Sequence, residues 1–181
     1  MKIGIKKLVF LLVVGLFTAC SPKEVEKVQS KVFLEQHLHE FIGNNPDWVK
    51  DDATQKVITE KFKHKMINLS NEADFLKDMP LKLISVKDTS INEIRTKIAT
   101  FKAYGDTSRT ENSLLNYMQL QINGIVTQKQ ASELKVNENY KIKGSLHKQG
   151  KRADVKFIHV AGFRGYDLGK YTFVVNQYDK I

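Results

Sequence analysis

Cysteine, proline and tryptophan are scarce in this chain of 181 residues, which has one cysteine, three prolines and one tryptophan. A single cysteine excludes a disulfide-stapled scaffold and any zinc site built from several cysteines. Hydrophobic residues make up 41% and charged residues 27%, the mix of an ordinary globular protein rather than a disordered chain or a collagen. Beyond the first twenty residues there is no long apolar run, which excludes a protein with several membrane-spanning helices.

The first twenty residues form a separate unit with the pattern of an export signal. Lysines at positions 2, 6 and 7 precede an apolar run over residues 8–17, which is too short to span a bilayer. The sequence then continues as Leu16-Phe17-Thr18-Ala19-Cys20-Ser21. A basic start, a short apolar run and small residues before a cleavage point are typical of a secretory signal.

This segment resembles the lipobox of bacterial lipoproteins, with Phe17 in place of the leucine that the family usually has three residues before the cysteine. The resemblance implies a signal peptide over residues 1–19 and a diacylglycerol attached to Cys20, whose new amine is often acylated as well. Stable anchoring needs at least two acyl chains, because each buried methylene contributes only about 0.8 kcal/mol. We therefore expect a lipid-anchored cell-envelope protein. Ser21 after the cysteine indicates the outer membrane if the host is Gram-negative.

The rest of the chain divides near Pro80 into two sections that differ in pattern and charge. Residues 20–80 carry nine basic and eleven acidic side chains, whereas residues 81–181 carry seventeen basic and nine acidic ones. Helical spacing of apolar residues in the first section predicts helices over 25–42, 53–69 and 71–78. The middle helix would be capped by Asp51 or Asp52. Its expected apolar stripe is Val57, Ile58, Phe62, Met66 and Leu69.

The second section alternates apolar and polar residues, which is typical of strands with one buried face. The alternation predicts six strands, over 81–87, 93–104, 116–127, 139–147, 154–161 and 170–177. The glycine-rich residues 162–169 are expected to form a hairpin connection, in which Phe163, Arg164 and Tyr166 are candidate recognition side chains. Helices followed by a run of strands indicate an α+β fold.

Two stretches in the second section resemble parts of small OB-like barrels. Residues 134–146 are similar to a strand of such barrels, where Gly144 would allow sharp coiling, and residues 168–173 are similar to the closing strand of OB-like domains in bacterial lipoproteins. The resemblance implies an antiparallel six-stranded OB-like small barrel over 81–181, which would follow the helical segment that apolar spacing predicts over 20–80. A cystatin-like or NTF2-like helix with a curved sheet fits the same order of elements and stays an alternative.

Residues that could carry catalysis or bind a metal form no recognisable motif. His37 and His39 lie two positions apart on a predicted helix and point to nearly opposite sides, so they cannot share one metal ion. The chain has neither the His-Glu-x-x-His pattern of zinc proteases nor the Gly-x-Ser-x-Gly turn of serine hydrolases. We therefore expect no metal, no cofactor and no catalytic residue, and we favour a non-enzymatic protein.

The strongest remaining signal is a run of basic residues over 141–170. Six of them form a candidate contact surface, namely Lys141, Lys143, Lys148, Lys151, Arg152 and Arg164. Such a surface attracts phosphates, anionic lipid headgroups or acidic glycans. The export signal argues against nucleic acid as the ligand. The prediction is a binding or assembly module, tethered through Cys20, that contacts an envelope protein, an acidic glycan or a lipid surface.

Two other functions stay open at this point. One is an enzyme, or an inhibitor of one, that acts on envelope polymers and has a cleft with convergent polar groups. The other is an OB-type module for oligosaccharides or oligonucleotides, which would expose strand aromatics for stacking. The second interpretation depends on the exposure of Tyr140, Tyr171 and Phe173.

Overall fold

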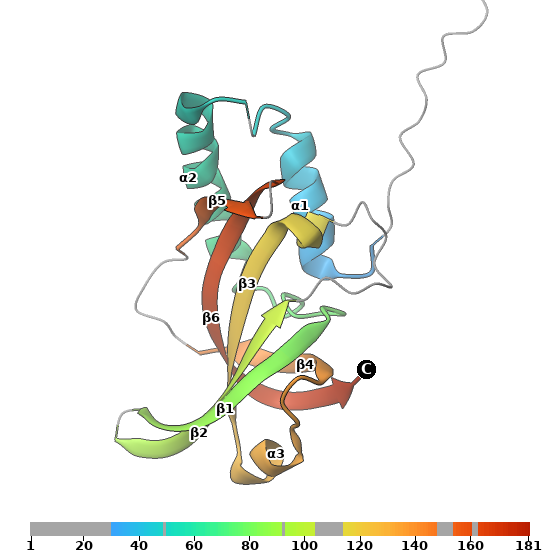
Figure 1. The fold of residues 1–181 in the computed structure, drawn as a ribbon, viewed down its shortest axis with the longest axis vertical. Coiled ribbons are helices and arrows are strands. Elements are labelled where there is room, and N and C mark those ends of the chain that lie inside the picture. The colour runs from blue at the N-terminus through green and yellow to red at the C-terminus, as the bar shows by residue number, and fades with distance from the viewer. Residues whose placement is uncertain (1–29, 49, 92, 104–113, 148–153, 161–162) are drawn as a thin grey trace, which may run out of the picture.

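The computed structural model describes residues 30–48, 50–91, 93–103, 114–147, 154–160 and 163–181. The helical elements are α1 (Phe33–Gly43), α2 (Asp52–Leu69), the 3-10 turn η3 (Leu114–Tyr117) and α3 (Gln128–Glu133). The strands are β1 (Leu81–Ile91), β2 (Ile94–Ala103), β3 (Met118–Val126), β4 (Asn139–Leu146), β5 (Lys156–Val160) and β6 (Phe163–Lys180). Helices α1 and α2 lie at one end of a coiled sheet, and α3 lies at the other (Figure 1).

The second predicted helix is confirmed as α2, and its cap is Asp51. The Asp51 carboxylate accepts a hydrogen bond of 2.8 Å from the backbone N–H of Thr54, which satisfies a donor that the first helical turn leaves free. The backbone N–H and the side-chain hydroxyl of Thr54 both donate to Asp51, and these two hydrogen bonds lower its pKa. The expected stripe is buried except for Val57, whose side chain is 57% exposed, so its assignment to the core is wrong.

The other two predicted helices differ from the structure. The described part of the first one starts at Phe33, and the expected start near residue 25 lies outside the described residues. Residues 71–78 form successive turns instead of a helix, because backbone N–H groups such as those of Phe75 and Lys77 bond to carbonyls three residues back. Such a short segment gains too few hydrogen bonds to offset helix nucleation. Phe75 and Leu76 are nevertheless buried, as expected.

Five strands close into a small barrel in the order β1, β2, β3, β6, β4 and back to β1. The pairs are antiparallel except for β3 with β6, which run parallel. One parallel pair is required because strands cannot alternate in direction all the way around a ring of five. The short helix α3 connects β3 to β4. This arrangement confirms the predicted α+β fold with an OB-like small barrel.

The sixth strand, β5, stands outside the barrel and pairs with the first part of β6. Val160 is the backbone partner of Phe163, and Lys156 is the partner of Asp167. Strand β6 therefore begins at Phe163, and residues 163–169, which were expected to be a hairpin connection, are already strand. The second part of β6 pairs with β4 instead. Strand β6 thus runs from the barrel to the β5–β6 pair that lies next to the helices (Figure 1).

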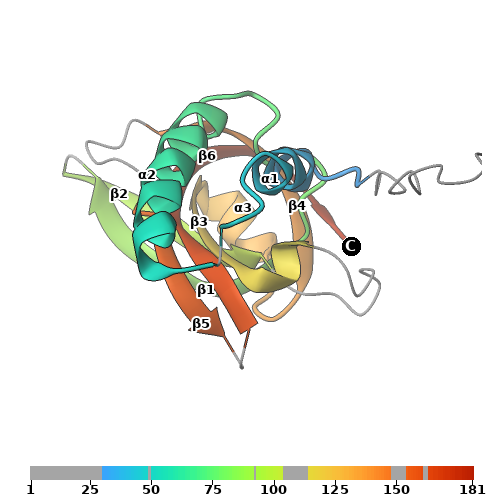
Figure 2. The same ribbon diagram turned by 90° about the horizontal axis from the view of Figure 1, so that it is seen from above.

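The helices and the barrel share one continuous apolar core. The ring of Phe62 in α2 meets Tyr166 of β6 edge-on with centroids 5.0 Å apart, and Trp48 stacks on the same tyrosine at 5.8 Å. Phe75 stacks on Phe173 of the barrel at 5.8 Å. Full burial of an aromatic side chain contributes about 1.5–3 kcal/mol. Figure 2 shows α1 and α2 side by side over this end of the sheet.

Candidate binding face

The predicted basic residues do not gather on one described surface. Lys141 and Lys143 lie on β4, whereas Arg164 lies at the start of β6, beside β5 and at the other end of that long strand. The side chains of Lys143 and Arg164 are exposed. The remaining three predicted contact residues, Lys148, Lys151 and Arg152, lie outside the described residues.

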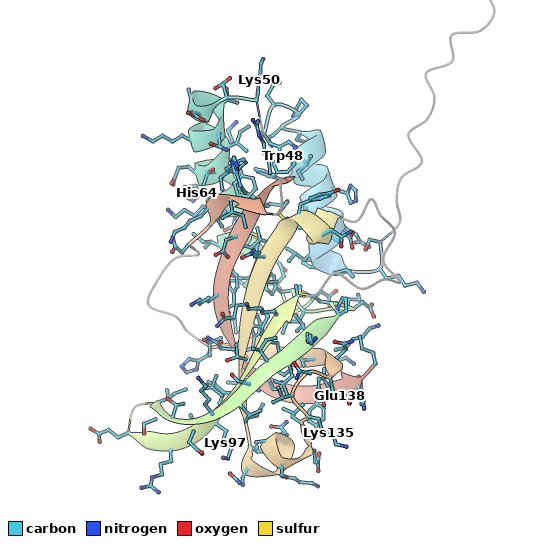
Figure 3. The ribbon with its side chains drawn as sticks, viewed as in Figure 1. Trp48, Lys50, His64, Lys97, Lys135 and Glu138 are labelled. Atoms are coloured by element: carbon cyan, nitrogen blue, oxygen red, sulfur yellow. The ribbon has the colours of Figure 1, made fainter. Side chains whose placement is uncertain are left out.

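On the β4 side, two lysines are paired with carboxylates from distant parts of the chain. The Nζ atom of Lys141 donates a hydrogen bond of 2.9 Å to Asp78, and this hydrogen bond lowers the pKa of the Asp78 carboxyl. Lys180 of β6 lies 2.9 Å from Glu138, the residue before β4, and its hydrogen bond lowers the pKa of Glu138 in the same way. Lys135 also lies near Glu138 in this region (Figure 3).

The strand aromatics face the barrel interior. Tyr140, Tyr171 and Phe173 are buried, with exposed fractions of 2%, 3% and 2%. None of these three rings can stack on a nucleobase, so the feature that would have supported an oligonucleotide module is missing at these positions. Tyr166, expected as a recognition side chain, is also fully buried, because it fills the space between α2 and the sheet. The interpretation of Tyr166 as a recognition side chain is therefore wrong.

Polar side chains lie together on a different surface, the outer face of the neighbouring strands β2, β3 and β6. Backbone partners across these strands form a cationic row, a polar row and an apolar row. The rows are Lys102 with Gln121 and Lys170, Thr100 with Asn123 and Thr172, and Ile98 with Ile125 and Val174. We call these nine residues the three-row face. They alternate along each strand with side chains that fill the barrel, such as Phe101, Ile122 and Phe173.

The three-row face runs between two hollows. A hollow of about 270 Å³ lies at the cationic row, and we call it the lysine hollow; its polar lining consists of Lys102, Gln119, Gln121, Asp167 and Lys170. A second hollow of about 430 Å³ lies at the apolar row, where Ile125 and Val174 meet the start of α3. Lys97, on the edge of this second hollow, forms an ion pair of 2.8 Å with Asp88 (Figure 3).

A bulge in β6 shapes the lysine hollow. Gln119 is paired with Asp167 but Gln121 is paired with Lys170, so β6 has one more residue here than β3. Gly169 lies inside the bulge with φ of +90°, a conformation that residues with a Cβ rarely adopt. The Asp167 side chain accepts a 2.9 Å hydrogen bond from the N–H of Gly169. In a regular strand Asp167 and Lys170 would point to opposite faces, but the bulge lets both line the hollow.

The polar centre of the face is preordered by a hydrogen bond between amides. The Nε2 atom of Gln121 donates to the Oδ1 atom of Asn123 over 2.9 Å, which fixes the orientation of both side chains. The alternation of Gln119, Gln121 and Asn123 with apolar residues is visible in the sequence of β3. Their alignment with Lys102 and Lys170 is not, because it depends on the register of three strands that are far apart in the chain.

Comparison with known proteins finds no family model that matches this chain and no similar protein among curated sequences or solved structures. Within the described residues, no group of three or more histidine, cysteine, aspartate or glutamate side chains is placed to hold a metal ion. The described helices include none that is long and apolar enough to cross a membrane.

Proposed function

We propose that this chain is a lipid-anchored protein of the cell envelope whose barrel is a non-enzymatic binding module. The observation that carries the binding role is the three-row face, where hydrogen-bonding and cationic side chains form ordered rows between two hollows. OB-like barrels use the outer face of their second and third strands to hold extended ligands. The side chains here are mainly amides, hydroxyls and lysines, which suit recognition of a polar ligand.

The anchor would be Cys20, and the lipobox pattern around it supports this part of the proposal. Ser30, the first described residue, follows Cys20 by ten positions, so a fully extended chain would reach about 36 Å at most. The barrel would therefore work close to the membrane surface, where its ligand must be accessible. Two or three acyl chains give the permanent attachment that such a role needs.

The anchoring is tested by metabolic labelling of the host with an alkyne analogue of palmitate. The wild-type chain is expected to carry the label and to fractionate with membranes, whereas Cys20→Ser is expected to lose both properties. A labelled Cys20→Ser variant, or an unlabelled wild type, would contradict lipid attachment at this residue.

The binding face is tested in the same cells by a photoreactive benzophenone amino acid placed at single positions. Asn123 lies at the centre of the three-row face, and Lys143 on β4 serves as the matched control outside it. We expect a discrete crosslinked species from position 123 that position 143 does not give and that Cys20→Ser reduces. Crosslinking from position 143 alone would move the contact surface to β4 and overturn the assignment.

A further inference from the structure

The charged and hydrogen-bonding side chains of the lysine hollow limit the chemical classes of ligand that fit it. Among the described residues that line it, Lys102 and Lys170 are the cationic ones and Asp167 is the acidic one. Both lysine side chains are exposed, and Gln121 lies between them on the central strand. The lysines stand two strand spacings apart, about 10 Å across the sheet. A ligand that lies across the three strands can engage both lysines.

The acceptor groups of the hollow distinguish among anionic ligands. One oxygen of Asp167 accepts from the N–H of Gly169, and the carboxylate has further lone pairs for a donor on the ligand. The amides of Gln119 and Gln121 both donate and accept. A polyphosphate offers only acceptors and would face repulsion from Asp167. A sugar chain with carboxylates offers hydroxyl donors to Asp167 and the amides, and negative charges to the lysines.

On these grounds we infer that the lysine hollow binds a carboxylate-bearing glycan, in which sugar acids pair with Lys102 and Lys170 and sugar hydroxyls bond to Asp167 and Gln121. This inference rests on the proposed binding function and specifies its ligand. Hydrogen bonds in which one partner is charged contribute about 1.5–3 kcal/mol each, or about tenfold or more in affinity. The apolar row further along the face gives the sugar rings an uncharged surface next to this subsite.

The test measures binding of a defined glycan to the full mature lipoprotein in detergent micelles by titration calorimetry. The probe is an oligogalacturonate, which carries one carboxylate on each sugar, and its methyl ester is the neutral control with the same skeleton. We expect the acid form to bind and the ester to bind at least tenfold more weakly. Lys102→Gln and Lys170→Gln should each weaken binding of the acid about tenfold. Lys102→Arg and Lys170→Arg, which keep the charge, should restore most of the affinity.

Lys143→Gln is the matched control, because it removes one exposed lysine from β4 and leaves the hollow unchanged. Equal losses in Lys143→Gln and Lys102→Gln would show unspecific charge attraction and overturn the subsite. Equal binding of the acid and its ester would overturn the carboxylate requirement while leaving the binding module intact. Absence of glycan binding, together with a crosslinked protein from position 123, would overturn the ligand class and keep the proposed function. If inorganic pyrophosphate competed for the lysine hollow as well as the oligogalacturonate does, the assignment of a glycan ligand would also be overturned.

Discussion

Two lysines on the β4 side of the barrel and one on the three-row face have different surroundings. Lys141 and Lys180 lie 2.9 Å from the carboxylates of Asp78 and Glu138. Lys102, by contrast, forms no ion pair with any described residue, and its backbone partner on β3 is Gln121. The first pair of lysines has its charge largely compensated within the protein, while the charge of Lys102 is open to solvent.

The difference shows why a run of basic residues in a sequence does not locate a basic surface. Asp78, the partner of Lys141, lies 63 positions away in the chain, in the turns that precede β1. Such a partner becomes visible only when the helical segment has folded against the barrel. The charge that matters for binding is the charge left after these pairs have formed. Changes to each side should therefore have different consequences, for stability on the β4 side and for binding on the other.

The largest expected effect comes from Gly144, whose backbone partner on β6 is Val175. A Cβ atom at this position would lie 2.3 Å from the backbone carbonyl oxygen of Val174. Because neither strand can move without breaking the ladder, Gly144→Ala should destabilise the protein by about 3 kcal/mol. Urea unfolding at neutral pH measures the loss. Gly43→Ala is the control, because nothing lies within 4 Å of its added Cβ, and a similar loss there would contradict the explanation.

A smaller effect is expected from Gly169, the glycine of the bulge beside the three-row face. Its φ of +90° and a contact of 3.2 Å between an added Cβ and the N atom of Asp154 both oppose a side chain. Gly169→Ala should cost about 1–2 kcal/mol in the free energy of unfolding. It should also weaken oligogalacturonate binding, because the bulge sets the direction of Lys170. Binding that stays unchanged in a destabilised Gly169→Ala protein would show that the bulge serves the fold alone.

The ion pair on the β4 side should appear in the acid limb of the stability profile. Asp78 has a lowered pKa in the folded protein, chiefly through its hydrogen bond from Lys141. Its stabilising contribution is therefore complete above the unfolded pKa of about 4 and is lost as the pH falls through the lower folded value. Asp78→Asn should lower the free energy of unfolding at pH 7 by about 0.2–1 kcal/mol. The effect is small because the side chains of Asp78 and Lys141 are 38% and 42% exposed.

Asparagine is the suitable replacement because residue 78 has a φ of +57°, which asparagine tolerates as aspartate does. Urea unfolding across pH 2 to pH 7 should bring the wild-type and Asp78→Asn curves together in acid. Curves that stay parallel down to the lowest pH would show that ionisation of Asp78 is not the source of the difference.

The same side of the barrel should show a signal in alkali. Tyr178 of β6 donates a hydrogen bond to Glu133 of α3, and this bond is the main cause that raises the pKa of Tyr178 to about 12. The stabilisation is present below the ordinary tyrosine pKa of about 10 and is lost as the pH rises toward 12. In Glu133→Gln the phenol should titrate near its ordinary range. Ultraviolet titration of phenolate absorbance in both proteins measures the change, and identical titration curves would contradict it.

The local elements were largely predictable from the sequence, and the strand over residues 163–169 shows what a local pattern misses. Strands such as 139–147 show a clear alternation, and α2 has both a helical stripe and a capping residue. Residues 163–169 were misassigned because glycines there suggest a turn. In the structure, Gly165 lets β6 pass against the carbonyl of Tyr117, where an added Cβ would lie at 1.9 Å. That contact joins residues far apart in sequence, so no local pattern reports it.

The candidate site was less predictable than the fold for the same reason. The sequence shows the amides of β3 and the basic residues after it, but it does not show which lysines share a row. The lysine hollow combines Lys102 of β2, Gln121 of β3 and Lys170 of β6, which come together only when β3 and β6 pair in parallel. The one-residue bulge then decides that Lys170 and Asp167 line the same hollow.

The smallest expected effect tests the comparison most directly. Lys102→Gln should change the free energy of unfolding by less than about 0.5 kcal/mol, as for an exposed residue that has no special contact. Lys141→Gln should cost more, up to about 1 kcal/mol, because it leaves Asp78 without its partner. Parallel urea unfolding of the two variants measures both values. If Lys102→Gln were the more destabilising of the two, Lys102 would serve the fold, and the distinction between a paired side and a ligand-facing side of the barrel would fail.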